Sequence, residues 1–154
     1  TRGVLASVQV RSANSILFGQ EDFFKLETDV RTYLTFDRTL TLALALRTGF
    51  ALAYGASSTV PATDRFFLGG DSTHRAFAFG ELSPRNESGT LIGGNSFVLG
   101  NVELRFPLFG QLNGGLFLDL GDAWEHSDEP RYKEKWASLA YRIAMNYFIY
   151  DLTH

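Results

Sequence analysis

The sequence predicts an all-β fold, made of about six strands of an antiparallel transmembrane β-barrel that is larger than this chain. Three observations predict it. Apolar and polar residues alternate with a period of two in six stretches. Five of these are long enough to cross a bilayer, which takes about 9–11 residues of a tilted strand. The connections alternate between short turns and long loops, which is typical of outer-membrane barrels.

The first three strands are expected at 3–11, 21–36 and 39–54, each with one apolar face. These faces carry Val4, Val8, Val10, Phe24, Leu26, Val30, Leu42, Leu44 and Leu46. The opposite faces carry Ser7, Gln9, Arg11, Lys25, Glu27, Asp29, Arg31, Ala45 and Arg47. Because charges of both signs alternate along the second strand, they indicate the inner wall of a barrel rather than a pair of catalytic carboxylates.

The last three strands are expected at 96–108, 112–124 and 135–150. Their apolar faces carry Val98, Val102, Leu104, Leu116, Leu118, Leu120, Tyr141, Ile143 and Met145. Their polar faces carry Asn101, Glu103, Arg105, Asn113, Asp119, Arg142 and Asn146. Period-two alternation over thirteen or more residues is longer than most soluble strands, whose usual length is about 5–6 residues.

The connections complete the prediction of one domain over residues 1–154. Short turns are expected at Asp37-Arg38 and around Gly110, and the long loop 55–95 is expected on the other side of the membrane. Six strands are fewer than the eight of the smallest common membrane barrels, and open sheet edges are not tolerated in lipid. We therefore expect the remaining strands to come from the same parent protein or from another chain. No signal peptide precedes Thr1, so we expect a mature or excised piece.

Composition excludes several other classes. The net charge of −3 excludes a nucleic-acid-binding protein held by a basic field, and the absence of cysteine excludes disulfides and thiolate zinc sites. The histidines His74, His126 and His154 are far apart and lack metal-ligand spacing, so we expect neither a metal nor another cofactor. No nucleophile and base are paired in the sequence, so we do not expect an enzyme.

The long loop carries the most specific pattern. It contains Asp64-Arg65-Phe66-Phe67-Leu68-Gly69-Gly70, then His74-Arg75-Ala76-Phe77, and later Ile92-Gly93-Gly94-Asn95. The strands Gly100–Pro107 and Gly115–Trp124 follow in the same order. Together with the opening Thr1-Arg2-Gly3, these segments resemble the bacterial surface-antigen superfamily of outer-membrane assembly barrels, the BamA/TamA type. The resemblance covers essentially the whole chain and implies the late strands, with loop six, of a sixteen-stranded barrel.

In that family, the core of loop six reads (Val/Ile)-Arg-Gly-(Phe/Tyr) and folds back into the barrel lumen, where its arginine pairs with acidic residues of the wall. The alternation independently places Glu103 and Asp119 on the inner face. We therefore expect Arg75 to bond to Asp119 with Glu103 close by. This sequence departs from the family at His74 and Ala76, where the family has Val or Ile and Gly.

Two further sets of loop residues are expected to shape this contact. Phe77 and Phe79 are expected to pack against Phe117 and the small residues of the third strand. The glycine pairs are expected to supply turns and close backbone approach, at Gly69, Gly70, Gly93 and Gly94.

The resemblance implies a factor that inserts β-barrel proteins into the bacterial outer membrane, or an organelle outer membrane of bacterial origin. Its partners would be the lipid bilayer and client outer-membrane proteins. Two alternatives remain within the superfamily: a two-partner secretion translocator and the anchor barrel of a patatin-type lipase. Upstream POTRA repeats or a Gly-x-Ser-x-Gly lipase domain would distinguish them. An alternative of another class is a soluble β-sandwich binding module, in which the Leu42–Leu52 face would pack against a second sheet.

Overall fold

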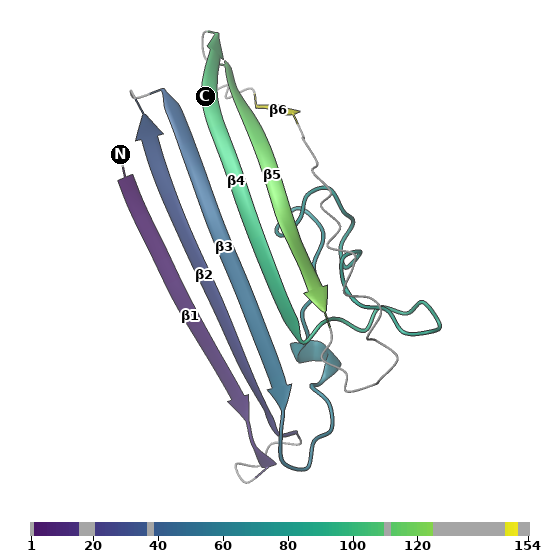
Figure 1. The fold of residues 1–154 in the computed structure, drawn as a ribbon. Coiled ribbons are helices and arrows are strands. Elements are labelled where there is room, and N and C mark those ends of the chain that lie inside the picture. Colours follow the sequence, from purple (N-terminus) through teal and green to yellow (C-terminus); the bar gives the residue numbers. More distant parts are fainter. Residues whose placement is uncertain (1, 16–20, 37–38, 110–111, 125–146, 151–154) are drawn as a thin grey trace.

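The computed structural model describes residues 2–15, 21–36, 39–109, 112–124 and 147–150. It confirms the all-β prediction, since one six-stranded antiparallel sheet has the strands in chain order (Figure 1). The strands are β1 (Arg2–Ala13), β2 (Phe23–Phe36), β3 (Leu40–Ala53), β4 (Ser96–Phe109), β5 (Leu112–Trp124) and β6 (Tyr147–Tyr150). The sheet is open, as expected of part of a barrel.

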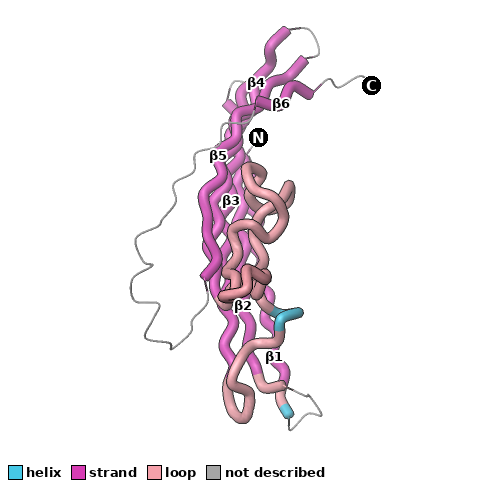
Figure 2. Tube along the Cα trace, turned by 90° about the vertical axis from the view of Figure 1, so that its right-hand side faces the viewer, coloured by secondary structure: helices cyan, strands magenta, loops and turns pink. Residues whose placement is uncertain are grey.

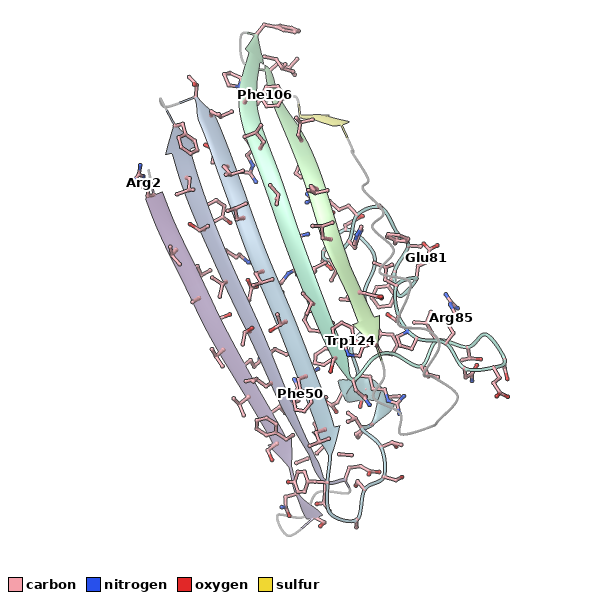
Figure 3. The ribbon with its side chains drawn as sticks, in the orientation of Figure 1. Arg2, Phe50, Glu81, Arg85, Phe106 and Trp124 are labelled. Atoms are coloured by element: carbon pink, nitrogen blue, oxygen red, sulfur yellow. The ribbon has the colours of Figure 1, made fainter. Side chains whose placement is uncertain are left out.

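The strands differ from the expected ranges mainly at their ends. Of the strand expected at 135–150, the structure describes only β6, which pairs with the start of β5, and residues 135–146 lie outside the described part. The expected turn residues Asp37-Arg38 and Gly110-Gln111 lie outside it as well. Arg2 pairs with Leu34, so it lies at the end of the sheet where β2 ends, and Figure 3 shows it there. Among the described residues, no helix is long and apolar enough to cross a membrane.

The two faces of the sheet have different surroundings. One face is apolar and exposed, and Leu46 at the middle of β3 keeps 51% of its surface accessible. Other exposed side chains of this face are Val4, Val8, Val10, Phe24, Val30, Phe36, Phe50, Leu52, Val98 and Leu120. In the described part of the chain, no second sheet covers this face. Such a broad apolar surface is expected where a sheet faces lipid.

The long loop between β3 and β4 lies along the opposite, inner face (Figure 2). It includes one turn of 3-10 helix, η2 (Ala62–Asp64). The buried core lies between this loop and the wall and consists of Val60, Phe66 and Leu68 from the loop with Phe23, Ala51, Phe97, Leu99 and Ala123 from the strands. Gly49 makes room for it, because a Cβ there would lie 2.2 Å from Phe97 Cε1 and 2.7 Å from Phe66 Cζ.

The base of the loop is tied to the segment between β1 and β2. The Asp22 carboxylate accepts hydrogen bonds from the backbone N–H of Ser15 at 2.6 Å and of Ala56 at 3.3 Å. The Asp22 N–H donates to Ser57 Oγ at 2.8 Å. The bonds from Ser15 and Ala56, the Ser15 backbone bond first, lower the pKa of Asp22 below its usual value of 3.8. The start of the loop is thus attached beside β2 before its tip reaches the wall.

Candidate functional site

The inner face of β4 and β5 places three polar side chains within reach of the loop tip. In the β4–β5 register, Asn101 is opposite Asp119, and Glu103 is opposite Phe117. Alternation along a strand points these odd-numbered residues to one side of the sheet. The same face of β3 carries Ala43 and Ala45 at the positions paired with Glu103 and Asn101. Small side chains there leave space for the loop.

Arg75 binds Asp119 through both its side chain and its backbone. Arg75 Nε donates to Asp119 Oδ2 at 2.9 Å, and Nη2 donates to Oδ1 at 2.7 Å. The Arg75 N–H adds a third bond to Oδ2 at 3.1 Å. The guanidinium also lies 4.0 Å above the centre of the Phe117 ring, and its Nη1 is 3.9 Å from Glu103 Oε2. Bidentate arginine–carboxylate pairs of this kind are among the stronger polar contacts in proteins.

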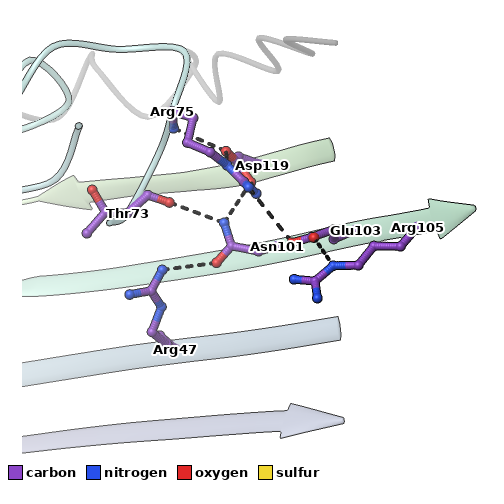
Figure 4. Close-up of polar contacts among 7 residues, drawn as sticks. All are labelled: Arg47, Thr73, Arg75, Asn101, Glu103, Arg105 and Asp119. Atoms are coloured by element: carbon purple, nitrogen blue, oxygen red, sulfur yellow. Dashed lines mark hydrogen bonds and ion pairs between the residues drawn. The ribbon is translucent and has the colours of Figure 1, made fainter. Parts of the chain in front are cut away.

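Asn101 connects this pair to the next strand and to the loop backbone (Figure 4). Its Nδ2 donates to Asp119 Oδ1 at 2.8 Å and to the Thr73 carbonyl at 3.1 Å. Its Oδ1 accepts a bond from Arg47 Nη2 at 3.1 Å. Alternation along the strand predicts that Asn101 lies on the polar face, but it predicts no role for this residue. Its position two residues before Glu103 on the same face was the available signal.

Other ion pairs of the inner wall run along a single strand. Arg31 binds Asp29 on β2 with Nη2 and Oδ2 2.6 Å apart, and Lys25 lies 3.1 Å from Glu27. On β4, Arg105 binds Glu103. Each of these pairs joins residues two apart, which share a face of the strand. The described part of β2 thus has the alternating charges expected of an inner wall.

The loop tip forms a tight turn at the two positions that depart from the family pattern. The Phe77 N–H donates to the His74 carbonyl at 3.2 Å, and Ala76 lies exposed in the turn between them. His74 is only 2% exposed, and its ring contacts Phe77 edge to face at 4.8 Å. Burial lowers the pKa of His74 below its usual value of 6.5, although the Asp119 carboxylate opposes this. A buried histidine therefore stands where the resemblance implies an aliphatic residue.

The packing expected for Phe79 was wrong, because this side chain is 77% exposed. Phe79 follows the His74–Phe77 turn and precedes a second turn at Gly80, whose φ is 74°. Phe77 is partly buried.

The four glycines expected to shape the loop lie at turns or close contacts. Gly69, Gly70 and Gly93 have φ angles of 116°, 89° and 76°, which side-chain-bearing residues rarely adopt. Gly94 has no such angle, but a Cβ there would lie 2.9 Å from the Trp124 carbonyl oxygen. Its N–H and carbonyl both bond to Phe66, at 2.8 Å each.

The arrangement is suited to holding the loop. Among the described residues, no three His, Asp or Glu side chains are grouped so that they could hold a metal ion. The Asp119 carboxylate instead accepts four hydrogen bonds, three from Arg75 and one from Asn101. Its charge is therefore compensated within the protein.

Comparison with known proteins agrees with this architecture. Residues 1–147 match the Omp85 superfamily domain. The chain is similar to the outer membrane protein assembly factor BamA of Neisseria meningitidis serogroup B (strain ATCC BAA-335 / MC58), with 31% identity over 135 residues. This match covers 81% of the chain but 17% of that relative, so the chain spans a small part of its length. The resemblance to the surface-antigen barrels is therefore confirmed. The chain belongs to the Omp85 superfamily and is part of a β-barrel of the outer-membrane protein assembly and translocation family, located in the bacterial outer membrane.

Proposed function

We propose that this chain is the late part of the barrel of an assembly factor that inserts β-barrel proteins into the outer membrane. The observation that carries the proposal is the similarity to BamA, which extends over 81% of the chain and includes the loop and both strands that bind it. The clients would be other outer-membrane proteins, and residues 1–154 would be one partial barrel domain completed by further strands. The proposal assigns the chain no catalytic chemistry.

Within this function, we propose that Arg75, Phe77, Glu103, Phe117 and Asp119 lock the loop against the inner wall. The support is geometric, since the wall supplies an almost fully buried carboxylate and the loop supplies the guanidinium that compensates it. A locked loop would hold the inner faces of β3, β4 and β5 in a fixed arrangement while the barrel acts on a client. The turns at Gly69, Gly70, Gly93 and Gly94 would allow the loop its compact path.

The test replaces the native gene with variants and measures how much folded β-barrel protein reaches the outer membrane. Arg75→Glu should lower that amount, because it sets two carboxylates against each other at Asp119. Adding Asp119→Arg should restore part of it, since the pair is re-formed with its charges exchanged. Arg85→Glu is the matched control, because Arg85 is exposed and its side chain bonds to the backbone carbonyl of Gly89.

Two outcomes would contradict the proposal in different ways. No restoration in the double variant would refute the direct pairing of Arg75 with Asp119 as the functional contact. Normal insertion of β-barrel proteins, together with loss of one exported protein, would refute the assembly role. That second result would favour a secretion translocator.

A further inference from the structure

A cavity of about 210 Å³ lies between the inner wall and the tip of the loop, beside the Arg75–Asp119 contact. Four arginines line it, one each from β2, β3, β4 and the loop: Arg31, Arg47, Arg105 and Arg75. Figure 4 shows three of them converging on Asn101 and Glu103. Arginine is the side chain best suited to binding oxyanions, because its fork of N–H groups matches two oxygens of a phosphate or carboxylate.

The charges around this cavity leave one arginine without a carboxylate. Arg31 is paired with Asp29, Arg75 with Asp119, and Arg105 with Glu103. Arg47 bonds only to the neutral amide of Asn101, and no carboxylate lies within 4.0 Å of it among the described residues. Asp71 also borders the cavity, but it is exposed and forms no ion pair with any other described residue.

Arg47 is also short of hydrogen-bond acceptors. Its Nε is buried and has no acceptor within the described residues. A buried donor without a partner costs about 1–3 kcal/mol, and such groups in native proteins commonly indicate an ion or water that binds there. The ion pairs of Arg31 and Arg105 use only part of each guanidinium, so further N–H groups on the same cavity remain available.

We propose that this cavity binds one compact oxyanion of the phosphate type, held chiefly by Arg47 and assisted by Arg31 and Arg105. Among the described residues Arg47 has no carboxylate within 4.0 Å, and one bound anion would supply the ion pair that it lacks there. The cavity opens on the inner face, away from the exposed apolar face of the sheet, so a soluble anion fits it better than a lipid headgroup. The proposal does not depend on the assembly function, since it concerns only the charge and hydrogen bonds of the wall.

The test measures thermal unfolding of the intact protein, purified in a detergent without phospholipid, as inorganic phosphate is added. Sodium chloride at matched ionic strength is the reference for general screening. A ligand that binds only the folded state raises its unfolding temperature in a saturable way, and we expect a rise of roughly 2–4 °C. Arg47→Gln should abolish the phosphate-specific rise, whereas the exposed Arg85→Gln should keep it.

Equal stabilisation by chloride, or an undiminished phosphate effect in Arg47→Gln, would show an adventitious ion only and overturn the proposal. Calorimetric titration of the wild-type protein with phosphate decides the question if Arg47→Gln fails to fold. Saturable binding of one phosphate per chain, in the detergent without phospholipid, supports the site. The absence of saturable binding refutes it. If binding saturates only after phospholipid is added, the cavity binds a lipid headgroup and the proposal of a soluble anion is overturned.

Discussion

Replacing Arg75 by leucine tests how far one contact holds the loop on the wall. The variant removes the two side-chain bonds to Asp119 and leaves a carboxylate that is only 3% exposed. Breaking a buried ion pair in this way costs about 3–5 kcal/mol. We expect the lower end, about 3 kcal/mol, because the backbone N–H of residue 75 and the Asn101 amide still bond to Asp119.

Hydrogen exchange measures this cost directly, because the loop must leave the wall for its amides to exchange. A loss of about 3 kcal/mol corresponds to roughly 10²-fold more frequent opening. The amides to follow are those of Gly70, which donates to the Phe77 carbonyl, and Leu68, which donates to Ser83 Oγ. Strand amides of β3 and β4 should exchange as before, and the exposed Arg85→Leu should change nothing. An increase below about threefold at the loop amides would refute the reasoning, because it corresponds to less than ~1 kcal/mol.

Three further perturbations test other parts of the structure. Leu46→Arg should lower the amount of this protein that inserts into the membrane, because an arginine that faces lipid near mid-membrane costs about 2–4 kcal/mol. Leu46→Ala should leave that amount unchanged. Unchanged insertion of the arginine variant would contradict a lipid-facing surface. Gly49→Ala should lower the free energy of unfolding by about 1–3 kcal/mol through its clash with Phe97. Gly3→Ala, whose Cβ would meet nothing within 4 Å, should leave it unchanged, and equal effects of the two would refute the close packing. Burial lowers the pKa of His74 while the loop is closed, so at low pH the opened loop binds a proton more readily than the closed loop. The protection of the loop amides from exchange should therefore be complete above pH ~6.5 and fall as the pH drops below it. His74→Gln should remove this pH dependence of loop protection, measured by hydrogen exchange after correction for intrinsic exchange rates. An unaltered pH profile in the variant would exclude His74 as its source.

The strand pattern of the described residues could be predicted from the sequence because its cause is local. Each residue of a strand points to the face opposite its neighbours, so alternation of apolar and polar residues fixes which side meets lipid. The same rule placed Glu103, Phe117 and Asp119 on one face. It predicted that they would be available to the loop, and the family resemblance added the expectation that Arg75 bonds to Asp119 with Glu103 close by.

The loop path depends on contacts that alternation does not describe. The prediction that Phe79 packs on the wall treated the loop as a continuous apolar segment. In the structure the turn at His74–Phe77 ends the contact, and Phe79 is exposed. The role of Asn101 was also missed, because an asparagine is an ordinary residue on the inner wall of a barrel. Its role follows from the register, which places it opposite Asp119 and within hydrogen-bonding distance of the Thr73 carbonyl.

By itself, the sequence determined the all-β class, the two faces of the sheet and the family to which the chain belongs, because each of these is recorded in residue type and spacing. The contact of Arg75 with Asp119, and with Glu103 close by, was expected from the family resemblance, but only the tertiary structure gives its distances. Only the tertiary structure also decided that Asn101 joins three elements and that, among the described residues, Arg47 has no carboxylate within 4.0 Å. These features depend on register and on how a 42-residue connection between β3 and β4 returns to the wall. Residues far apart in the chain meet there, and no local spacing encodes their distances.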